Sequence, residues 1–233
     1  MTTQSKKLML DMAVAFAVCM CLGALPAYCH DDDHPRGSMP DPFPMAQPAG
    51  SAKASVRKLL GSAKVPSSWD SRVHGWVTPV KNQGSYGTCW SFVACSVLET
   101  ALLKAGYGEF DLSERNMILN SGWNAPPNSG GNTTMSGNYI LRWQGPVLEA
   151  EDPYPAYGSS NADFGTGRMA LPKFKVLGAV RVPARSLPSL EDMATMLAGT
   201  ETMKRAIMEH GSLDVSYESC TKSSCYDHST GAT

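Results

Sequence analysis

A cysteine at the start of an amphipathic helix is the feature that most constrains this chain. Apolar residues recur every three or four positions between residues 88 and 106, so this segment is predicted to form a mostly buried helix that Gly106 ends. Cys89 lies in its first turn, directly after a glycine-bearing loop at residues 83–88. A helix N-terminus favours an anion, although it lowers a thiol pKa by less than about one unit from about 8.5. Cys89 is therefore a candidate nucleophile, and a packed core thiol is the alternative.

The remaining patterns indicate an α+β fold, with a helical N-terminal lobe followed by an incomplete strand-rich lobe. Further helices are predicted at 113–119 after Ser113, at 133–143 capped by Thr133 or Thr134, and at 189–199 and 200–210. Strand patterns occupy residues 173–182 and 213–218, where Leu213, Val215 and Tyr217 share one face.

The charge balance excludes two classes of partner. The chain has 20 basic and 21 acidic residues, a net charge of −1, and no basic run longer than two residues. Nucleic-acid binding needs a surface that neutralises phosphates, and this sequence offers none. Neither a nucleic acid nor an anionic membrane surface is therefore expected as a partner.

The N-terminal residues 1–29 have the layout of a secretory signal peptide. Lys6 and Lys7 precede an apolar run at residues 12–25, and small residues follow. This run is shorter than the roughly 20 residues that a spanning helix needs, so stable membrane insertion after cleavage is not expected. Cleavage is expected after Ala27 or Cys29, with a lipid-anchored Cys29 as the weaker option. The mature protein is expected to be secreted, periplasmic or on the cell surface.

Residues 30–64 form a Pro-, Gly- and Ser-rich linker or short pro-segment before the domain at residues 65–233. The cluster His30-Asp31-Asp32-Asp33-His34 could hold a metal, but a solvated N-terminus explains it equally well, so no metal site is predicted. Seven cysteines are present, of which Cys89, Cys95, Cys220 and Cys225 would remain after export. Cys220 and Cys225 could close a local loop in an oxidising compartment.

The residues around Cys89 resemble those of the papain-like cysteine peptidases. The similar segments are VPSSWDSR at 65–72, VTPVKNQGSYGTCWSF at 77–92, LSE at 112–114, GG at 130–131, EDPYP at 151–155 and residues 207–211. The resemblance covers residues 65–233 and implies the papain-like two-lobe fold.

The resemblance also implies roles for individual residues. Cys89 corresponds to the nucleophile, and Gln83 to the side chain that holds the oxyanion together with the Cys89 amide. Gly130 and Gly131 correspond to the segment against which a peptide substrate lies. Trp90 is a further substrate-contact candidate, although packing between the lobes is the stronger interpretation. No metal or organic cofactor is implied, and Cys95 is expected to be an inert packed thiol.

One departure from the family pattern concerns the loop before Cys89. The signature C-G-[SA]-C-[WY] appears here with Tyr86 in place of its first cysteine. Asn128 stands where relatives usually carry the disulfide partner of that cysteine. The loop is therefore expected to be held by packing, for example of Tyr86.

A second departure concerns the general base. The family's His and Asn follow the nucleophile by about 130–150 residues, and the chain is expected to end before both. His228 lies in this window, but its neighbours differ from those of the family's histidine, so it is only a weak candidate for the base. His210, at a helix end, is expected to act as a structural cation, and His74 as a surface residue.

The function expected from these residues is peptide-bond hydrolysis by a cysteine-type peptidase, with this chain being a fragment that is inactive alone. Two alternatives use the same fold: a non-catalytic peptide-binding or cell-surface module, and an acyltransferase with a thioester intermediate. A downstream histidine and asparagine would favour an enzyme.

Overall fold

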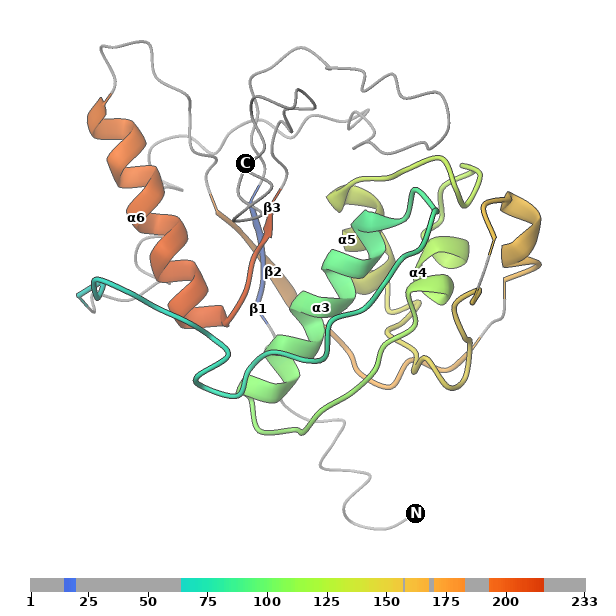
Figure 1. The fold of residues 1–233 in the computed structure, drawn as a ribbon, viewed down its shortest axis with the longest axis horizontal. Helices are drawn as coiled ribbons and strands as arrows, with labels where there is room; N and C mark the ends of the chain where they lie inside the picture. The colour runs from blue at the N-terminus through green and yellow to red at the C-terminus, as the bar shows by residue number, and fades with distance from the viewer. Residues whose placement is uncertain (1–14, 20–63, 157, 168–169, 183–192, 216–233) are drawn as a thin grey trace, which may run out of the picture.

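The computed structural model describes residues 15–19, 64–156, 158–167, 170–182 and 193–215. The predictions for residues 30–34, Cys220, Cys225 and His228 lie outside these residues. The elements follow in the order β1 (Ala15–Cys19), α3 (Cys89–Lys104), α4 (Glu114–Asn120), α5 (Thr133–Leu141), the short 3-10 helix η1 (Asn161–Phe164), β2 (Gly178–Val182), α6 (Met193–His210) and β3 (Asp214–Val215). Figure 1 shows α3, α4 and α5 gathered together and α6 standing apart from them.

Helix α3 is the centre of the hydrophobic core, as its sequence pattern predicts. Ala94, Leu98 and Leu102 on this helix are at most 2% exposed, and α4 and α5 pack against it. The helix ends where expected, because Gly106 adopts a φ of +77° that residues with a side chain rarely take. The predicted cap of α4 is also confirmed, since the Ser113 hydroxyl accepts a hydrogen bond from the Asn116 amide.

Two helix predictions are wrong in detail. Helix α5 is capped by Asn132, whose side chain accepts a hydrogen bond from the Met135 amide at 3.1 Å, and not by either threonine. Residues 193–210 form one continuous helix, α6, rather than two helices separated at Gly199. A single glycine costs a helix only about 1 kcal/mol relative to alanine, so it does not have to end one.

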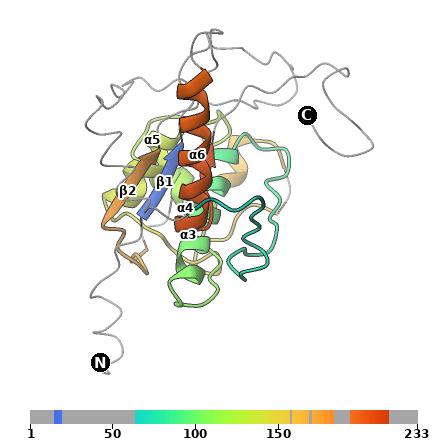
Figure 2. The same ribbon diagram turned by 90° about the vertical axis from the view of Figure 1, so that its left-hand side faces the viewer.

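A three-stranded parallel sheet lies between α6 and the helices α3 and α5. Strand β1 is the middle strand, pairing Ala15 with Gly178 of β2 and Val18 with Asp214 of β3. Figure 1 places α6 on one side of these strands and α3 on the other, and in Figure 2, which is viewed from the side of α6, this helix stands in front. Helices and strands thus form the predicted α+β fold, with a helical part and a strand-bearing part.

The middle strand belongs to the predicted signal peptide. Strands β2 and β3 are each hydrogen-bonded to β1, with β1 between them. Removal of residues 1–29 would therefore leave both without this neighbour. Cleavage of the signal peptide stays a prediction.

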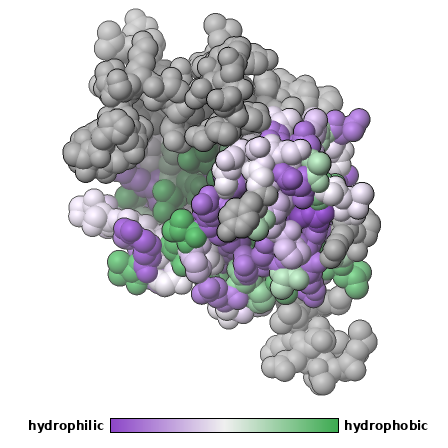
Figure 3. Space-filling model, turned by 45° about the vertical axis from the view of Figure 1, so that its right-hand side comes forward, coloured by the Kyte–Doolittle hydropathy of each residue, from purple (hydrophilic) through white to green (hydrophobic). Residues whose placement is uncertain are grey.

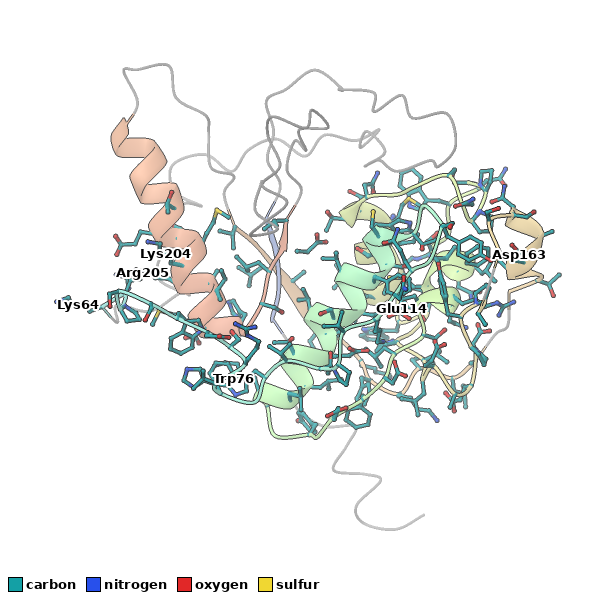
Figure 4. All side chains as sticks on the ribbon, viewed as in Figure 1. Lys64, Trp76, Glu114, Asp163, Lys204 and Arg205 are labelled. Atoms are coloured by element: carbon teal, nitrogen blue, oxygen red, sulfur yellow. The ribbon has the colours of Figure 1, made fainter. Side chains whose placement is uncertain are left out.

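An aromatic cluster joins the ends of α3 and α6. His74 is exposed, as predicted, and stacks on Trp69 with ring centroids 4.3 Å apart. Trp76 lies beside it and receives the Lys104 ammonium 3.6 Å above its ring (Figure 4). The Ser71 hydroxyl donates to the Gly211 carbonyl at 2.6 Å. These contacts hold the segment before Cys89 against both helices.

Candidate active site

Cys89 occupies the first position of α3, and its side chain is exposed. The backbone amides of Cys89 and Trp90 hydrogen-bond to the thiol and lower its pKa, as expected at a helix N-terminus. Desolvation has the larger effect, and the Asp214 carboxylate adds to it, so the net pKa of Cys89 lies above its ordinary value. The predicted position of Cys89 is confirmed, whereas the predicted small decrease in pKa is wrong.

Tyr154 fixes the loop that leads to Cys89. Its hydroxyl lies 3.1 Å from the Gln83 carbonyl oxygen and 2.6 Å from the Thr88 hydroxyl. A tyrosine hydroxyl has one proton, which it donates to the carbonyl, so Thr88 donates to Tyr154. One side chain thereby holds both ends of residues 83–88.

The Gln83 side chain is oriented by this loop. Its amide nitrogen Nε2 donates to the Tyr86 carbonyl oxygen at 2.7 Å. A primary amide has two hydrogens, and the described residues accept one of them. Donation of the second hydrogen to an oxyanion at Cys89, the role that the resemblance implies, remains a proposal.

A hydrogen bond joins Asn128, one of the two positions at which relatives carry a disulfide, to Gly87, the residue that follows Tyr86 at the other position. The Asn128 oxygen Oδ1 accepts from the Gly87 amide at 2.5 Å, and the Asn128 nitrogen Nδ2 donates to the Ser159 carbonyl oxygen at 2.7 Å. The Asn128 side chain thus links the loop before Cys89 to residues near η1. The sequence pattern identified Asn128 as the position of a lost cysteine, but it did not predict the hydrogen bond to the Gly87 amide.

Tyr86 packs as predicted. It is 2% exposed, its ring centroid lies 4.9 Å from that of Phe164 in an edge-on contact, and its hydroxyl donates to Asp163 at 2.9 Å. Figure 4 shows Asp163, a residue of η1, at the edge of the helical part. Burial, followed by the contact with Asp163, raises the pKa of Tyr86 to about 12, so it remains a neutral donor.

Gly131 lies against Trp90. A Cβ on Gly131 would come within 2.4 Å of the Trp90 indole, and Gly130 has a φ of +86°. Trp90 is 6% exposed, and its Nε1 has no hydrogen-bond partner among the described residues. Both glycines are buried, so a substrate could reach them only if the atoms above them moved. Packing is therefore a demonstrated reason for Gly131, and contact with substrate remains a proposal.

Asp214 is the residue near Cys89 that sequence reasoning missed. It is 7% exposed, accepts a hydrogen bond from the Thr133 side chain, and raises the pKa of Cys89. A signal existed, because the alternation in residues 213–218 puts Asp214 on the face opposite Leu213 and Val215. Acidic side chains are seldom buried, so a carboxylate on a strand face that packs against a helix indicates a candidate functional residue.

A partly buried charge cluster surrounds Lys81, with Glu99 and Glu114 buried and Asp111 exposed. The Lys81 ammonium contacts Glu99 at 2.7 Å, Asp111 at 2.6 Å and Glu114 at 2.9 Å. Burial alone would lower the pKa of Lys81, but the three carboxylates together raise it. Desolvation raises the pKa of Glu114 to about 7 despite Lys81. Figure 4 shows Glu114 within the helical part.

The described residues bring no imidazole to Cys89. His74 lies in the aromatic cluster, and His210 has a buried Nε2 without a partner. Burial lowers the pKa of His210, so it is not the predicted cation at the end of α6. Lys104 instead donates to the Met208 carbonyl there, at 3.3 Å. Residues 64–215, apart from the gaps stated above, contain no group of three or more side chains suited to a metal.

The described helices include none with the length and hydrophobicity required to cross a bilayer.

In Figure 3, hydrophilic side chains dominate the right-hand part of the coloured surface, and hydrophobic ones gather to its left. Exposed large hydrophobic residues include Val73 and Val80, at 82% and 99% exposure.

Comparison with known proteins decides the family. A family model described as papain family cysteine protease matches residues 65–232. The chain belongs to the papain family. Among its papain-family relatives, pro-cathepsin H of Mus musculus is 33% identical over 122 residues, which cover 52% of this chain and 36% of that protein. Cathepsin K of Mus musculus is 35% identical over 101 residues, covering 42% and 29%.

Solved structures include similar proteins as well. The bromelain protease from Ananas comosus, in complex with the E64 inhibitor, is 30% identical, covers 45% of each chain and has a TM-score of 0.38. The cysteine protease and lectin-like domains of Cwp84 from Clostridium difficile are 35% identical, covering 46% of this chain and 24% of that one, with a TM-score of 0.41. This papain-family chain spans about a third of the length of the curated relatives named above.

Proposed function

We propose that this chain carries the nucleophile side of a cysteine peptidase active site. The observation that carries the proposal is the exposed thiol of Cys89 at the N-terminus of α3, directly after a loop that holds the Gln83 amide in place. Membership of the papain family supports the reaction class. The substrates are peptides or proteins, met outside the cytoplasm if residues 1–29 direct export.

The reaction is an acyl transfer through Cys89. Its thiolate attacks the carbonyl carbon of a peptide bond, and the carbonyl oxygen becomes an oxyanion. The Gln83 Nε2 and the Cys89 amide donate to this oxygen, and one such donor is worth roughly 3–4 kcal/mol in the transition state. The C–N bond then breaks, the amine leaves with a proton, and water hydrolyses the thioester.

The described residues supply neither the thiolate nor that proton. The pKa of Cys89 is raised, and no described histidine is among the groups that shift it. Both tasks would fall to an imidazole, which the resemblance places in the C-terminal part of the family fold. This raised pKa is also what favours the second candidate, a peptide-binding module without catalysis.

An activated ester separates the two candidates, because its nitrophenolate leaves without a proton. The 233-residue chain is mixed with a peptidyl p-nitrophenyl ester at pH 8, and nitrophenolate release is measured. We expect release of one equivalent, with the acyl group on Cys89 in a peptide map. Cys89→Ala should abolish the burst, and Gln83→Ala should slow it by up to about 10²–10³-fold.

Cys95→Ala is the matched control, because Cys95 lies on the same helix but is 1% exposed. It should leave the burst unchanged. A chain that binds peptides without forming an acyl adduct would show the non-catalytic module instead. Acylation that persists in Cys89→Ala would overturn the proposal.

A further inference from the structure

Asp214 acts on the Cys89 thiol and is bonded to Thr133, a residue close in sequence to the glycine pair. It is on β3, which contacts α3, and its charge raises the pKa of the Cys89 thiol. Its carboxylate accepts a hydrogen bond from Thr133, the first residue of α5, two positions after Gly131. One buried acidic side chain thus links the start of α3, which carries Cys89, to the start of α5, which follows the proposed substrate-binding segment.

The charge of Asp214 is not balanced by a described cation. Other buried acids on the described chain have one: Glu114 pairs with Lys81, and Asp152 with Arg115. Asp214 makes no ion pair with the described Lys, Arg and His side chains, and burial raises its pKa to about 6. At pH 7 it is still mainly ionised. A buried, unbalanced charge is costly, and such groups concentrate at functional sites.

A structural role at the start of α5 does not require this charge. The helix already has a cap in Asn132, whose side chain accepts from the Met135 amide. Asp214 accepts a hydrogen bond from the Thr133 hydroxyl. The neutral side-chain oxygen of an asparagine at position 214 could accept the same bond. None of these contacts therefore requires the negative charge of Asp214.

We infer that Asp214 makes this site selective for peptides with a lysine or arginine side chain near the bond held at Cys89, an inference that rests on the proposed function. A peptide that displaces the atoms covering Gly130 and Gly131, and lies along them, passes the Thr133 end of α5. A basic side chain, with its charge at the end of a long flexible stem, can then reach this buried carboxylate and supply a cation that the described residues do not. Arginine can form two parallel hydrogen bonds to a carboxylate, which adds specificity.

The test measures binding, so that it does not depend on turnover. Fluorescent hexapeptides carrying arginine at one position are compared with citrulline peptides, which have the same shape without the charge. Dissociation constants are measured by anisotropy at pH 7 with the full chain bearing Cys89→Ala. At one or more positions, we expect arginine to bind at least tenfold more tightly than citrulline. Asp214→Asn should bring this ratio close to one.

Two further variants keep the test decisive. Glu201→Gln removes an exposed acid from α6 and should leave the ratio unchanged. Asp214→Glu keeps the charge and should keep a preference for arginine, so it remains informative if Asp214→Asn does not fold. Circular dichroism confirms that each variant is folded.

The possible outcomes separate this inference from the proposed function. If nitrophenyl esters acylate Cys89 but arginine and citrulline peptides bind equally, or if Asp214→Asn keeps the arginine preference, the inference is overturned and the proposed function stands. If the folded chain binds no peptide and Cys89 forms no acyl adduct, both are overturned.

Discussion

The side-chain oxygen of Asn128 accepts a hydrogen bond from the backbone amide of Gly87 at 2.5 Å. These residues stand at or beside the two positions that the papain-family pattern joins with a disulfide. In this chain, Asn128 and the packed Tyr86 take over the task of holding the loop before Cys89.

Replacing Asn128 should therefore destabilise the protein. Asn128→Ala leaves the Gly87 amide without its partner in a buried position, which costs about 1–3 kcal/mol of unfolding free energy. Urea denaturation measures this loss. Ser129→Ala removes an exposed hydrogen bond from the next residue and should change the free energy by less than about 0.5 kcal/mol. Equal losses in the two variants would mean that the Asn128 bond does not stabilise the loop.

The reactivity of Cys89 should depend on Asp214. Because desolvation and the Asp214 carboxylate raise the pKa of Cys89, its alkylation by iodoacetamide should increase with pH, with a midpoint above the ordinary thiol value of about 8.5. Asp214→Asn removes the repulsion between the two negative charges, so the midpoint should move to lower pH. Cys95, buried within the core, should stay unlabelled in the folded protein.

Fast alkylation of Cys89 at pH 5–6 would contradict this prediction. Such a result would mean that an imidazole already stabilises the thiolate. If His228→Ala abolished this fast alkylation, His228 would be identified as the base, a role that its neighbours in the sequence do not favour.

Glu114 should make the protein more stable in mild acid than at neutral pH. Burial raises its pKa from 4.5 to about 7 in the folded state, so the folded protein binds the proton more tightly than the unfolded chain. The stabilisation is complete below pH 4.5 and is lost as the pH rises to about 7, amounting to about 3 kcal/mol at most. Asp214, with a pKa raised to about 6, acts in the same direction.

Glu114→Gln should flatten this pH dependence, as urea denaturation at pH 4.5, 5.5, 6.5 and 7.5 would reveal. Glu201→Gln, at an exposed position of α6, should leave the slope as it is. A slope that is unchanged in Glu114→Gln would show that other groups cause it.

The sequence predicted best where a local pattern decides the structure. The apolar period of residues 88–106 and the Ser113 cap each depend on residues within a few positions, so α3 and α4 appear as expected. Contacts across the chain were not predictable in this way. The proximity of Asp214 to Cys89, 125 positions away in sequence, depends on how β3 packs against α3. Gly199 was wrongly predicted to end a helix, because the cost of one glycine, about 1 kcal/mol, is small enough for α6 to continue through it.

The N-terminus of the exported protein should lie between residues 28 and 31. The layout of residues 1–29 motivates this prediction, and intact-mass analysis of protein recovered outside the cytoplasm measures it. Since Ala15–Cys19 is the strand between β2 and β3, the cleaved chain should also unfold at a lower urea concentration than the uncleaved chain. Exported protein that retains Met1 would contradict the first expectation, and equal urea midpoints the second.

Gly131 should tolerate no side chain, whereas Gly137 on the following helix should accept one. A Cβ on Gly131 would lie 2.4 Å from the Trp90 indole, while one on Gly137 would meet nothing within 4 Å. Gly131→Ala should therefore cost about 1–3 kcal/mol by overpacking, and Gly137→Ala should stabilise α5 by about 0.5–1 kcal/mol. Thermal or urea unfolding measures both. Trp90→Leu in the Gly131→Ala background should recover part of the loss, because the smaller side chain leaves room for the methyl group. If Gly131→Ala is neutral, the close contact with Trp90 is not what requires a glycine at this position.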